Sequence, residues 1–173
     1  MATELTWPGH GSWSIKVDEH HVLLDPFFDD SPTAPFMAND VDCDYILVSH
    51  GHFDHVADVA SIANRTGATV VAIFEIAEWF SKNHGVKETL GMNLGGGVNL
   101  PFGRVKMTPA HHSLQLPDGS YGGNPAGFLL TLEVGNIYFA RDTALFSDMK
   151  LIGAAGIDLA ILPIGDHFTM GAG

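Results

Sequence analysis

The chain has 173 residues, 46% of them hydrophobic, and its 20 acidic and 8 basic residues give a net charge of −12. This length supports one hydrophobic core of ordinary size, so we expect a single domain spanning residues 1–173. The acidic balance, without any cluster of basic residues, disfavours nucleic acid and anionic membranes as partners. It leaves a small anionic substrate open, because bound divalent cations would change the local charge.

The first residues, MATELTWPGHGSWSIKV, lack the basic head and apolar stretch of a secretory signal, and no apolar segment is long enough to span a bilayer. The only cysteine, Cys43, has no partner for an internal disulfide, which agrees with a reducing compartment. We therefore expect a soluble, cytoplasmic protein in which Cys43 is a half-buried residue at a strand edge.

Short β-rich stretches open the chain and predict a sheet that begins antiparallel. They are ELTW, SWSIKV and HVLLDPF, at residues 4–7, 12–17 and 21–27, separated by Gly-rich or charged turns. A loop rich in Pro and Asp then leads into the next strand pattern.

Strand and helix patterns alternate over residues 45–85, which predicts a β-α-β-α unit and an α/β fold. YILVS and ATVVAIF, at residues 45–49 and 68–74, predict buried strands. Residues 56–67 and 75–85 carry apolar residues at helical spacing and each end at a glycine, the residue typical of a helix C-terminus.

The second half of the chain predicts further strands and one short helix. The stretch MNLGGGVNLPFG, residues 92–103, lacks the Lys and Ser/Thr of a phosphate loop, and we interpret it as a turn. Gly135-Asn136 is a hairpin signal. Strands are predicted at RVKMTPA, GFLLTLEV, NIYFA and DLAILPI, residues 104–110, 127–134, 136–140 and 158–164, and a short helix within residues 144–156.

Three histidines and an aspartate crowd into SHGHFDH, residues 49–55, directly after a buried strand pattern. If the backbone there is extended, His50 and His52 point to the same side and can share one cation, with Asp54 and His55 beside the same pocket. The simpler alternative is a loop in which Asp54 caps a helix and the histidines are exposed. The set as a whole favours a metal site, since capping requires no imidazoles.

SHGHFDH resembles the signature of the metallo-β-lactamase superfamily, and further blocks extend the resemblance over nearly the whole chain. They resemble uncharacterised metal-dependent hydrolases close to the ascorbate-6-phosphate lactonase branch. The resemblance implies an α/β fold of the αββα sandwich type and a hydrolase that activates water at a one- or two-metal centre. In order, the blocks are TWPGHGSWSI, VLLDPF, GMNLGGG, TPAHHS, IYFARDTALFSDMKLI and LAILPIGDHFTMG.

The resemblance also implies roles for individual residues. One divalent ion is held by three histidines and a second by Asp54 and His55, with Asp142 bridging both; Asp54 also orients the attacking water or accepts its proton. His112 is preferred to His111 because the family's ligand stands directly before a serine. A donor set without thiolate suits zinc, manganese, iron or nickel. The implied metal ligands are His50, His52, Asp54, His55, His112 and Asp142.

Three further residues are candidates for supporting roles. His10 matches a position near the family's pocket and is either a substrate contact or an ordinary turn residue. Asp25 matches a buried aspartate that orients a ligand histidine. Arg141 stands where the family has glycine, and it has three open interpretations: it pairs with Asp142 and competes with metal, holds an anionic substrate, or faces outward.

The family pattern continues beyond Gly173 with a helix, a strand and a late histidine ligand of the second metal. We therefore expect a sandwich without that last helix and strand, in which the apolar strand at residues 158–164 is exposed and homo-oligomers form.

The leading functional hypothesis is a hydrolase of a lactone or a small phosphorylated metabolite. The rival is a catalytically silent metal-binding or interaction protein of the same fold. A nuclease is disfavoured by the acidic charge.

Overall fold

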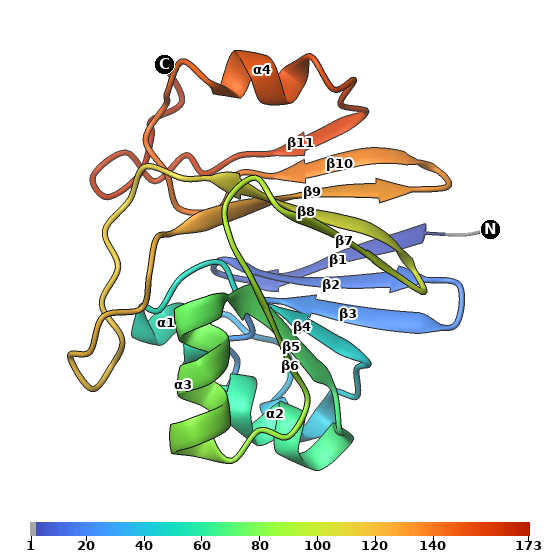
Figure 1. Ribbon diagram of the computed structural model, residues 1–173, viewed down its shortest axis with the longest axis vertical. Coiled ribbons are helices and arrows are strands. Elements are labelled where there is room, and N and C mark those ends of the chain that lie inside the picture. Colours follow the sequence, from blue (N-terminus) through green and yellow to red (C-terminus); the bar gives the residue numbers. More distant parts are fainter. Residues whose placement is uncertain (1–2) are drawn as a thin grey trace.

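The computed structural model describes residues 3–173, in which two β-sheets face each other and helices cover their outer sides (Figure 1). The first sheet has six strands, which lie in chain order: β1 (Thr3–Gly9), β2 (Ser12–Val17), β3 (His20–Leu24), β4 (Tyr45–Leu47), β5 (Thr69–Ile73) and β6 (Thr89–Met92). The second has five, in the order β11 (Leu159–Ile161), β10 (Gly135–Phe139), β9 (Ala126–Leu132), β8 (Gly103–Pro109) and β7 (Gly97–Leu100).

Strand direction in the two sheets brings several strand ends to one edge of the sandwich. β1, β2 and β3 pair antiparallel, as predicted, and β3 to β6 pair parallel, so the last four strands end at the same edge. In the second sheet β8 and β10 both pair antiparallel with β9 and therefore also run in one direction. The loops that follow these strands are the natural place for a functional site.

The helices form the two outer layers. α1 (Phe53–Val56), α2 (Val59–Thr66) and α3 (Phe74–His84) lie outside the first sheet, whereas α4 (Met149–Gly153) lies beyond the second (Figure 1). A single 3-10 turn, η1 (Ala38–Asp40), precedes β4. Met149 and Ile152 of α4 pack against Leu129 and Tyr138 on the outer face of β9 and β10. The order of layers is αββα, which confirms the predicted α/β sandwich.

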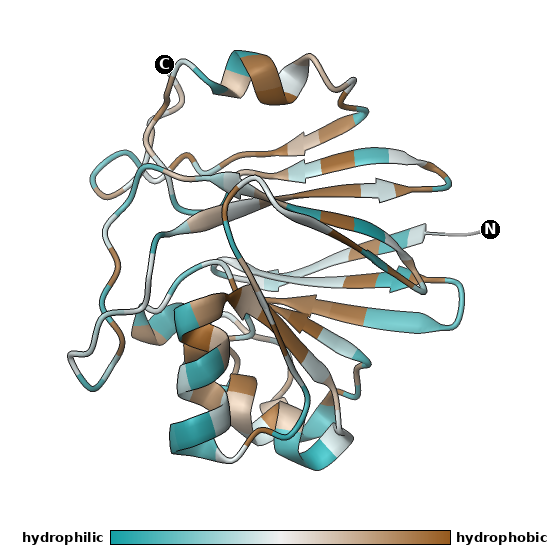
Figure 2. Ribbon diagram, in the orientation of Figure 1, coloured by the Kyte–Doolittle hydropathy of each residue, from teal (hydrophilic) through white to brown (hydrophobic). Residues whose placement is uncertain are grey.

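The core fills the space between the sheets and beneath α2 and α3. Figure 2 shows the apolar residues concentrated in the central strands and on the inner faces of these helices. α2 buries Val59, Ile62 and Ala63, spaced as one helical face, and ends at Gly67 with a φ of 78°. Each fully buried Leu, Ile or Phe contributes about 1.5–3 kcal/mol by leaving water. This packing holds the two sheets in a fixed position relative to each other. The loops at their common edge are therefore fixed as well.

The structure differs from the sequence prediction in the helix after SHGHFDH. Residues 53–66 form two helices in place of one helix from residue 56. The break falls at Asp58, whose carboxylate accepts hydrogen bonds from the backbone of Phe28 at 2.5 Å and Asp29 at 3.2 Å. This side chain ties the helix junction to the loop after β3, an interaction that helical periodicity cannot reveal.

The glycine-rich stretch of residues 92–103 was wrongly predicted to be only a turn. It contains the end of β6 and the whole of β7, which pairs with β8 from Gly97↔Lys106 to Leu100↔Gly103. The predicted hairpin between β9 and β10 is confirmed, but its turn is at Glu133 and Val134, because Gly135 already pairs with Leu132.

The last predicted strand forms as β11 at the edge of the second sheet, and Leu159 and Ala160 are exposed there. Within residues 3–173, no helix has both the length and the apolar character needed to cross a membrane.

Candidate metal centre

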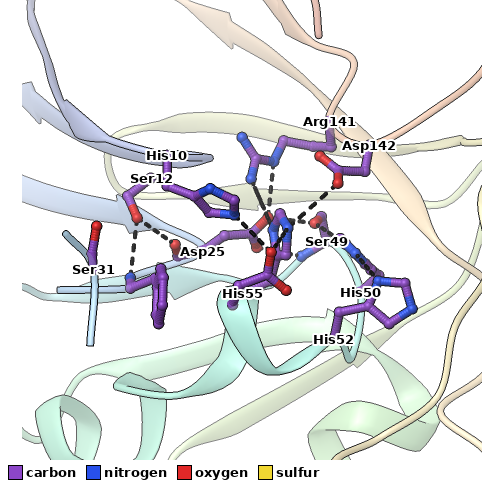
Figure 3. Close-up of polar contacts among 12 residues, drawn as sticks. His10, Ser12, Asp25, Ser31, Ser49, His50, His52, His55, Arg141 and Asp142 are labelled. Atoms are coloured by element: carbon purple, nitrogen blue, oxygen red, sulfur yellow. Dashed lines mark hydrogen bonds and ion pairs between the residues drawn. The ribbon is translucent and has the colours of Figure 1, made fainter. Parts of the chain in front are cut away.

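Polar loops meet at the common edge of the two sheets (Figure 3). Asp25 follows β3, residues 49–55 follow β4, His112 follows β8, and Asp142 follows β10. His10 reaches the same place from the turn between β1 and β2, because β2 begins beside the end of β3, where Trp13 pairs with Leu24. The fold thus gathers residues from five separate segments.

Three histidines form one group, in which nitrogen atoms of His50, His52 and His112 lie within 4.8 Å of one another. His50 Nε2 and His52 Nδ1 are 3.0 Å apart, which fits side chains at i and i+2 pointing the same way. The His112 ring lies almost perpendicular to the His50 ring, with centroids 5.1 Å apart. Three converging imidazoles are a typical donor set for one divalent ion.

A second group lies beside the first and contains Asp54, His55 and Asp142. His55 Nε2 is 3.7 Å from Asp54 Oδ2 and 3.5 Å from Asp142 Oδ2. This nitrogen is buried and has no hydrogen-bond partner among the described residues. Asp142 Oδ2 is also 3.8 Å from His112 Nε2, so Asp142 lies between the two groups. A buried imidazole nitrogen that faces two carboxylates fits a second ion.

Asp25 lies beneath both groups and is fully buried. Its Oδ1 accepts the backbone N–H of Ser49 at 2.7 Å, and its Oδ2 accepts His55 Nδ1–H at 2.9 Å and the Ser49 hydroxyl. Ser49 Oγ in turn lies 2.9 Å from His50 Nδ1. Asp25 therefore orients His55 directly and His50 through Ser49, so that the Nε2 atom of each ring points away from Asp25 and into its group of candidate ligands.

Arg141 is buried and forms its ion pair with Asp25, through Nε at 2.9 Å and through Nη2. Of the three interpretations left open for Arg141, the one in which it faces outward is excluded, because only 5% of its side chain is exposed. The pairing also differs from the alternative in which Arg141 pairs with Asp142. Arg141 has a φ of 60°, and its side chain lies at the floor of the site, where Nε donates to Asp25.

The surroundings shift the pKa values of these groups in opposite directions. Burial, followed by the nearby His55, lowers the pKa of His50 well below its ordinary value. Burial also opposes charge on His55, but Asp142 and Asp25 outweigh it and raise the pKa of His55 to about 9. A neutral imidazole is a ready metal ligand, whereas His55 occupies a position where the carboxylates favour a cation, either a proton or a metal ion.

The carboxylates around the site are ionised at neutral pH. Burial by itself would raise the pKa of Asp25, but Arg141 and His55 hold it well below its usual range. His55 likewise outweighs burial and lowers the pKa of Asp142 to about 2. A hydrogen bond from His10, with Nε2 2.8 Å from Asp54 Oδ2, holds the pKa of Asp54 well below its usual range.

A cleft of about 700 Å³ opens over the two groups. His10, His52, Asp54, His112 and Asp142 contribute to its floor. Its walls are largely apolar and include Trp7, Trp13, Ile161, Leu162, Ile164 and Phe168. The cleft therefore combines a polar floor with apolar walls, the usual composition of a small-molecule site.

His111 lies outside the cluster, because its ring stacks on Phe146 with centroids 4.5 Å apart and an interplanar angle of 15°. Its backbone N–H donates to Thr143 Oγ1 at 2.8 Å, and its carbonyl accepts the Ala144 N–H at 2.9 Å. These bonds tie the loop of His112 to the loop of Asp142. They explain how the candidate ligands that follow β8 and β10 come together.

Sequence reasoning missed several residues of the site. Ser49 was part of the quoted motif but had no assigned role, and Thr143 had none either. Gly11 was also missed: a Cβ there would lie 2.8 Å from Arg141 Nη2 and 3.0 Å from His55 Cε1. Its signal was the pair of glycines around His10. The apolar walls carried no recognisable signal, because isolated Trp and Phe residues are common in any core.

A family model described as the beta-lactamase superfamily domain matches residues 20–172. The chain therefore belongs to the β-lactamase superfamily, and its two-sheet architecture is that of the metallo-β-lactamase fold. A metallo hydrolase from the hyperthermophilic archaeon Ignicoccus hospitalis, Igni18, has a similar solved structure, with a TM-score of 0.85 and 31% identity over 98% of this chain and 73% of the other.

Within the superfamily, this chain is a member of the UPF0173 metal-dependent hydrolases. A relative from Methylacidiphilum infernorum is 46% identical over 165 residues, which cover 94% of this chain and 73% of the relative. A relative from Thermus thermophilus is 46% identical over 168 residues, which cover 97% of this chain and 74% of the relative. The relationship to the ascorbate-6-phosphate lactonase branch stays a prediction.

Proposed function

We propose that this protein hydrolyses a small ester-like molecule, a lactone in the first instance, at a centre of one or two divalent ions. His50, His52 and His112 would hold the first ion, and Asp54, His55 and Asp142 the second, with Asp142 shared. The observation that carries the proposal is the buried Nε2 of His55, which has no hydrogen-bond partner among the described residues and faces two ionised carboxylates.

Divalent ions in such a site polarise the bond to be cleaved and lower the pKa of a water molecule towards neutrality. Asp54 lines the cleft, and 41% of its side chain is exposed, so its carboxylate is accessible to a molecule bound there. Its low pKa favours orienting the attacking water over taking up its proton. His10 Nε2, at 2.8 Å from Asp54 Oδ2, holds this carboxylate in place at the floor of the cleft.

The donor set of imidazoles and carboxylates suits zinc, manganese, iron or nickel. Cys43 adds no thiolate, because it is buried beside β4, away from the cluster. A cytoplasmic location is part of the proposal, and the single cysteine of the sequence favours it.

The walls of the cleft support an uncharged substrate over a phosphorylated one. Trp7, Trp13 and Phe168 offer apolar contact surface. Among residues 3–173, Arg141 is the only Arg or Lys that lines the cleft. Its guanidinium is already paired with Asp25, and only 5% of its side chain is exposed. A phosphate group would have only the divalent ions as cationic partners, with no free Arg or Lys side chain to hold it. The apolar walls instead match an apolar substituent, so a lactone that carries one is the better fit.

Two measurements test this function. Metal content per chain, determined by plasma mass spectrometry on protein purified without chelators, should approach one or two equivalents and fall in the His50→Ala/His52→Ala double variant. Turnover of a panel of aliphatic lactones, thioesters and phosphodiesters should then depend on added Zn²⁺ or Mn²⁺. It should drop by at least about a hundredfold in Asp54→Asn.

The rival function, a catalytically silent metal-binding protein, predicts a different result from the same panel. Metal would be bound in the wild-type chain, yet no member of the panel would be hydrolysed faster than by the His52→Ala variant. Absence of bound metal from the wild-type protein would contradict both functions.

A further inference from the structure

A permanent positive charge lies directly behind the second group of proposed ligands. Arg141 Nη2 is 3.2 Å from His55 Nδ1, and both groups donate to the same carboxylate oxygen, Oδ2 of Asp25 (Figure 3). Arg141 and Asp25 are buried, so solvent screens their charges only weakly.

The protein accommodates this guanidinium in two ways. Arg141 adopts a φ of 60°, a left-handed conformation that favours glycine and is unusual for a long side chain. Gly11, in the turn between β1 and β2, leaves open the space that the guanidinium and His55 occupy, since a Cβ there would lie 2.8 Å from Nη2. The unusual backbone conformation of Arg141 and the missing side chain of Gly11 thus both accommodate the guanidinium at this place.

Arg141 weakens the effect of the Asp25 carboxylate on His55 as a metal ligand. A carboxylate behind a ligand histidine strengthens the donor nitrogen, because its negative charge increases the electron density of the ring. Here the guanidinium neutralises that carboxylate through two N–H groups. A divalent ion bound at His55 Nε2 also meets the repulsion of a fixed cation on the other side of the ring.

The first group of ligands is less affected. His50 lies near Asp25 but has no hydrogen bond to it and is linked to it through Ser49 Oγ. His52 faces Ser113, with Nε2 3.5 Å from its hydroxyl. The positive charge therefore acts mainly on the ion at Asp54, His55 and Asp142.

We propose that Arg141 is a positioning residue that lowers the affinity of the second ion relative to the first, so that this chain binds its two ions with widely separated affinities. The inference rests on the proposed metal centre and adds to it the regulation of its occupancy. Arg141 acts through Asp25 and His55 and contacts neither ion.

The test is a titration of the metal-free protein with Co²⁺ in the wild type and three variants. Calorimetry and visible absorbance monitor the binding. Arg141→Gly removes the charge and the backbone strain, and Arg141→Asn removes the charge in a residue that tolerates positive φ. Arg141→Lys keeps a positive charge. Thermal melting, monitored by circular dichroism, checks that each variant is folded. Among the three variants, glycine is the residue that a φ of 60° accommodates best.

We expect the second Co²⁺ to bind about tenfold to a hundredfold more tightly in Arg141→Gly and in Arg141→Asn, with the first Co²⁺ unchanged and Arg141→Lys close to wild type. Equal or weaker binding of the second ion in Arg141→Gly would overturn the inference, while the first ion would still support the metal centre. A gain in Arg141→Gly alone, with folded Arg141→Asn like wild type, would assign the effect to backbone strain and overturn the role of charge. No Co²⁺ binding in any of the proteins would overturn the proposed metal centre itself.

Discussion

Asp25 and Arg141, 116 positions apart in the sequence, form an ion pair with side-chain exposures of 0% and 5%. The pair joins the loop after β3 to the loop after β10 and so connects the two sheets beneath the candidate metal centre. Removing one partner of a buried ion pair leaves the other charge without compensation and typically costs about 3–5 kcal/mol.

The substitution Asp25→Asn should therefore lower the free energy of unfolding by about 3–5 kcal/mol, since Arg141 would lose its partner and the amide cannot replace a carboxylate that accepts from three residues. Denaturation with urea measures this difference. Asp30→Asn, a change of the same chemistry at an exposed position, should leave stability within about 0.5 kcal/mol of wild type. Equal stability of the Asp25 and Asp30 variants would show that the ion pair contributes nothing.

The neighbouring histidines His111 and His112 provide a matched pair of variants. His112→Ala should reduce metal binding, because it removes one of the three nitrogen atoms that converge with His50 and His52. His111→Ala should retain metal, since that ring stacks on Phe146 outside the cluster. Equilibrium dialysis against Zn²⁺ followed by metal analysis compares the two. Loss of metal in the His111 variant alone would reverse the proposed assignment.

Cys43 should be unreactive in the folded protein. Burial raises the pKa of its thiol to about 12, so the thiolate is scarce below that pH. A raised thiol pKa means that the neutral form persists through neutral and mildly alkaline pH. Ellman's reagent at pH 8 should thus detect far less than one thiol per chain until denaturant is added. Rapid reaction of the native protein would show that the loop before β4 opens.

Self-association through the edge of the second sheet is the expected consequence of exposed apolar residues around β11. Leu159 is 43% exposed on this edge strand, and Leu162, Ile164 and Phe168 follow it. Light scattering should detect dimers or larger species that increase with concentration. Leu159→Lys should reduce them, because a lysine on an edge strand disfavours pairing with another strand.

Val134→Lys, in the turn between β9 and β10, is the matched control at an exposed apolar residue away from β11 and should not change association. A clean monomer at high concentration of the wild-type chain would contradict this prediction.

Much of the fold followed from local sequence patterns. The alternation of strand and helix over residues 45–85 and the glycines that end α2 and α3 were predicted, because hydrophobic periodicity and positive-φ glycines act over a few residues. The motif SHGHFDH likewise indicated a metal site, since His50 and His52 two positions apart point the same way in extended backbone.

Only the tertiary structure decided what depends on distant contacts. The junction at Asp58 requires Phe28 and Asp29, β7 requires β8, and the partner of Arg141 is 116 residues away. Sequence reasoning left three alternatives for Arg141, because a side chain's direction depends on a φ value and on the space opposite it. Here Arg141 has a φ of 60°, Gly11 leaves open the space that its guanidinium occupies, and the charge pairs with Asp25.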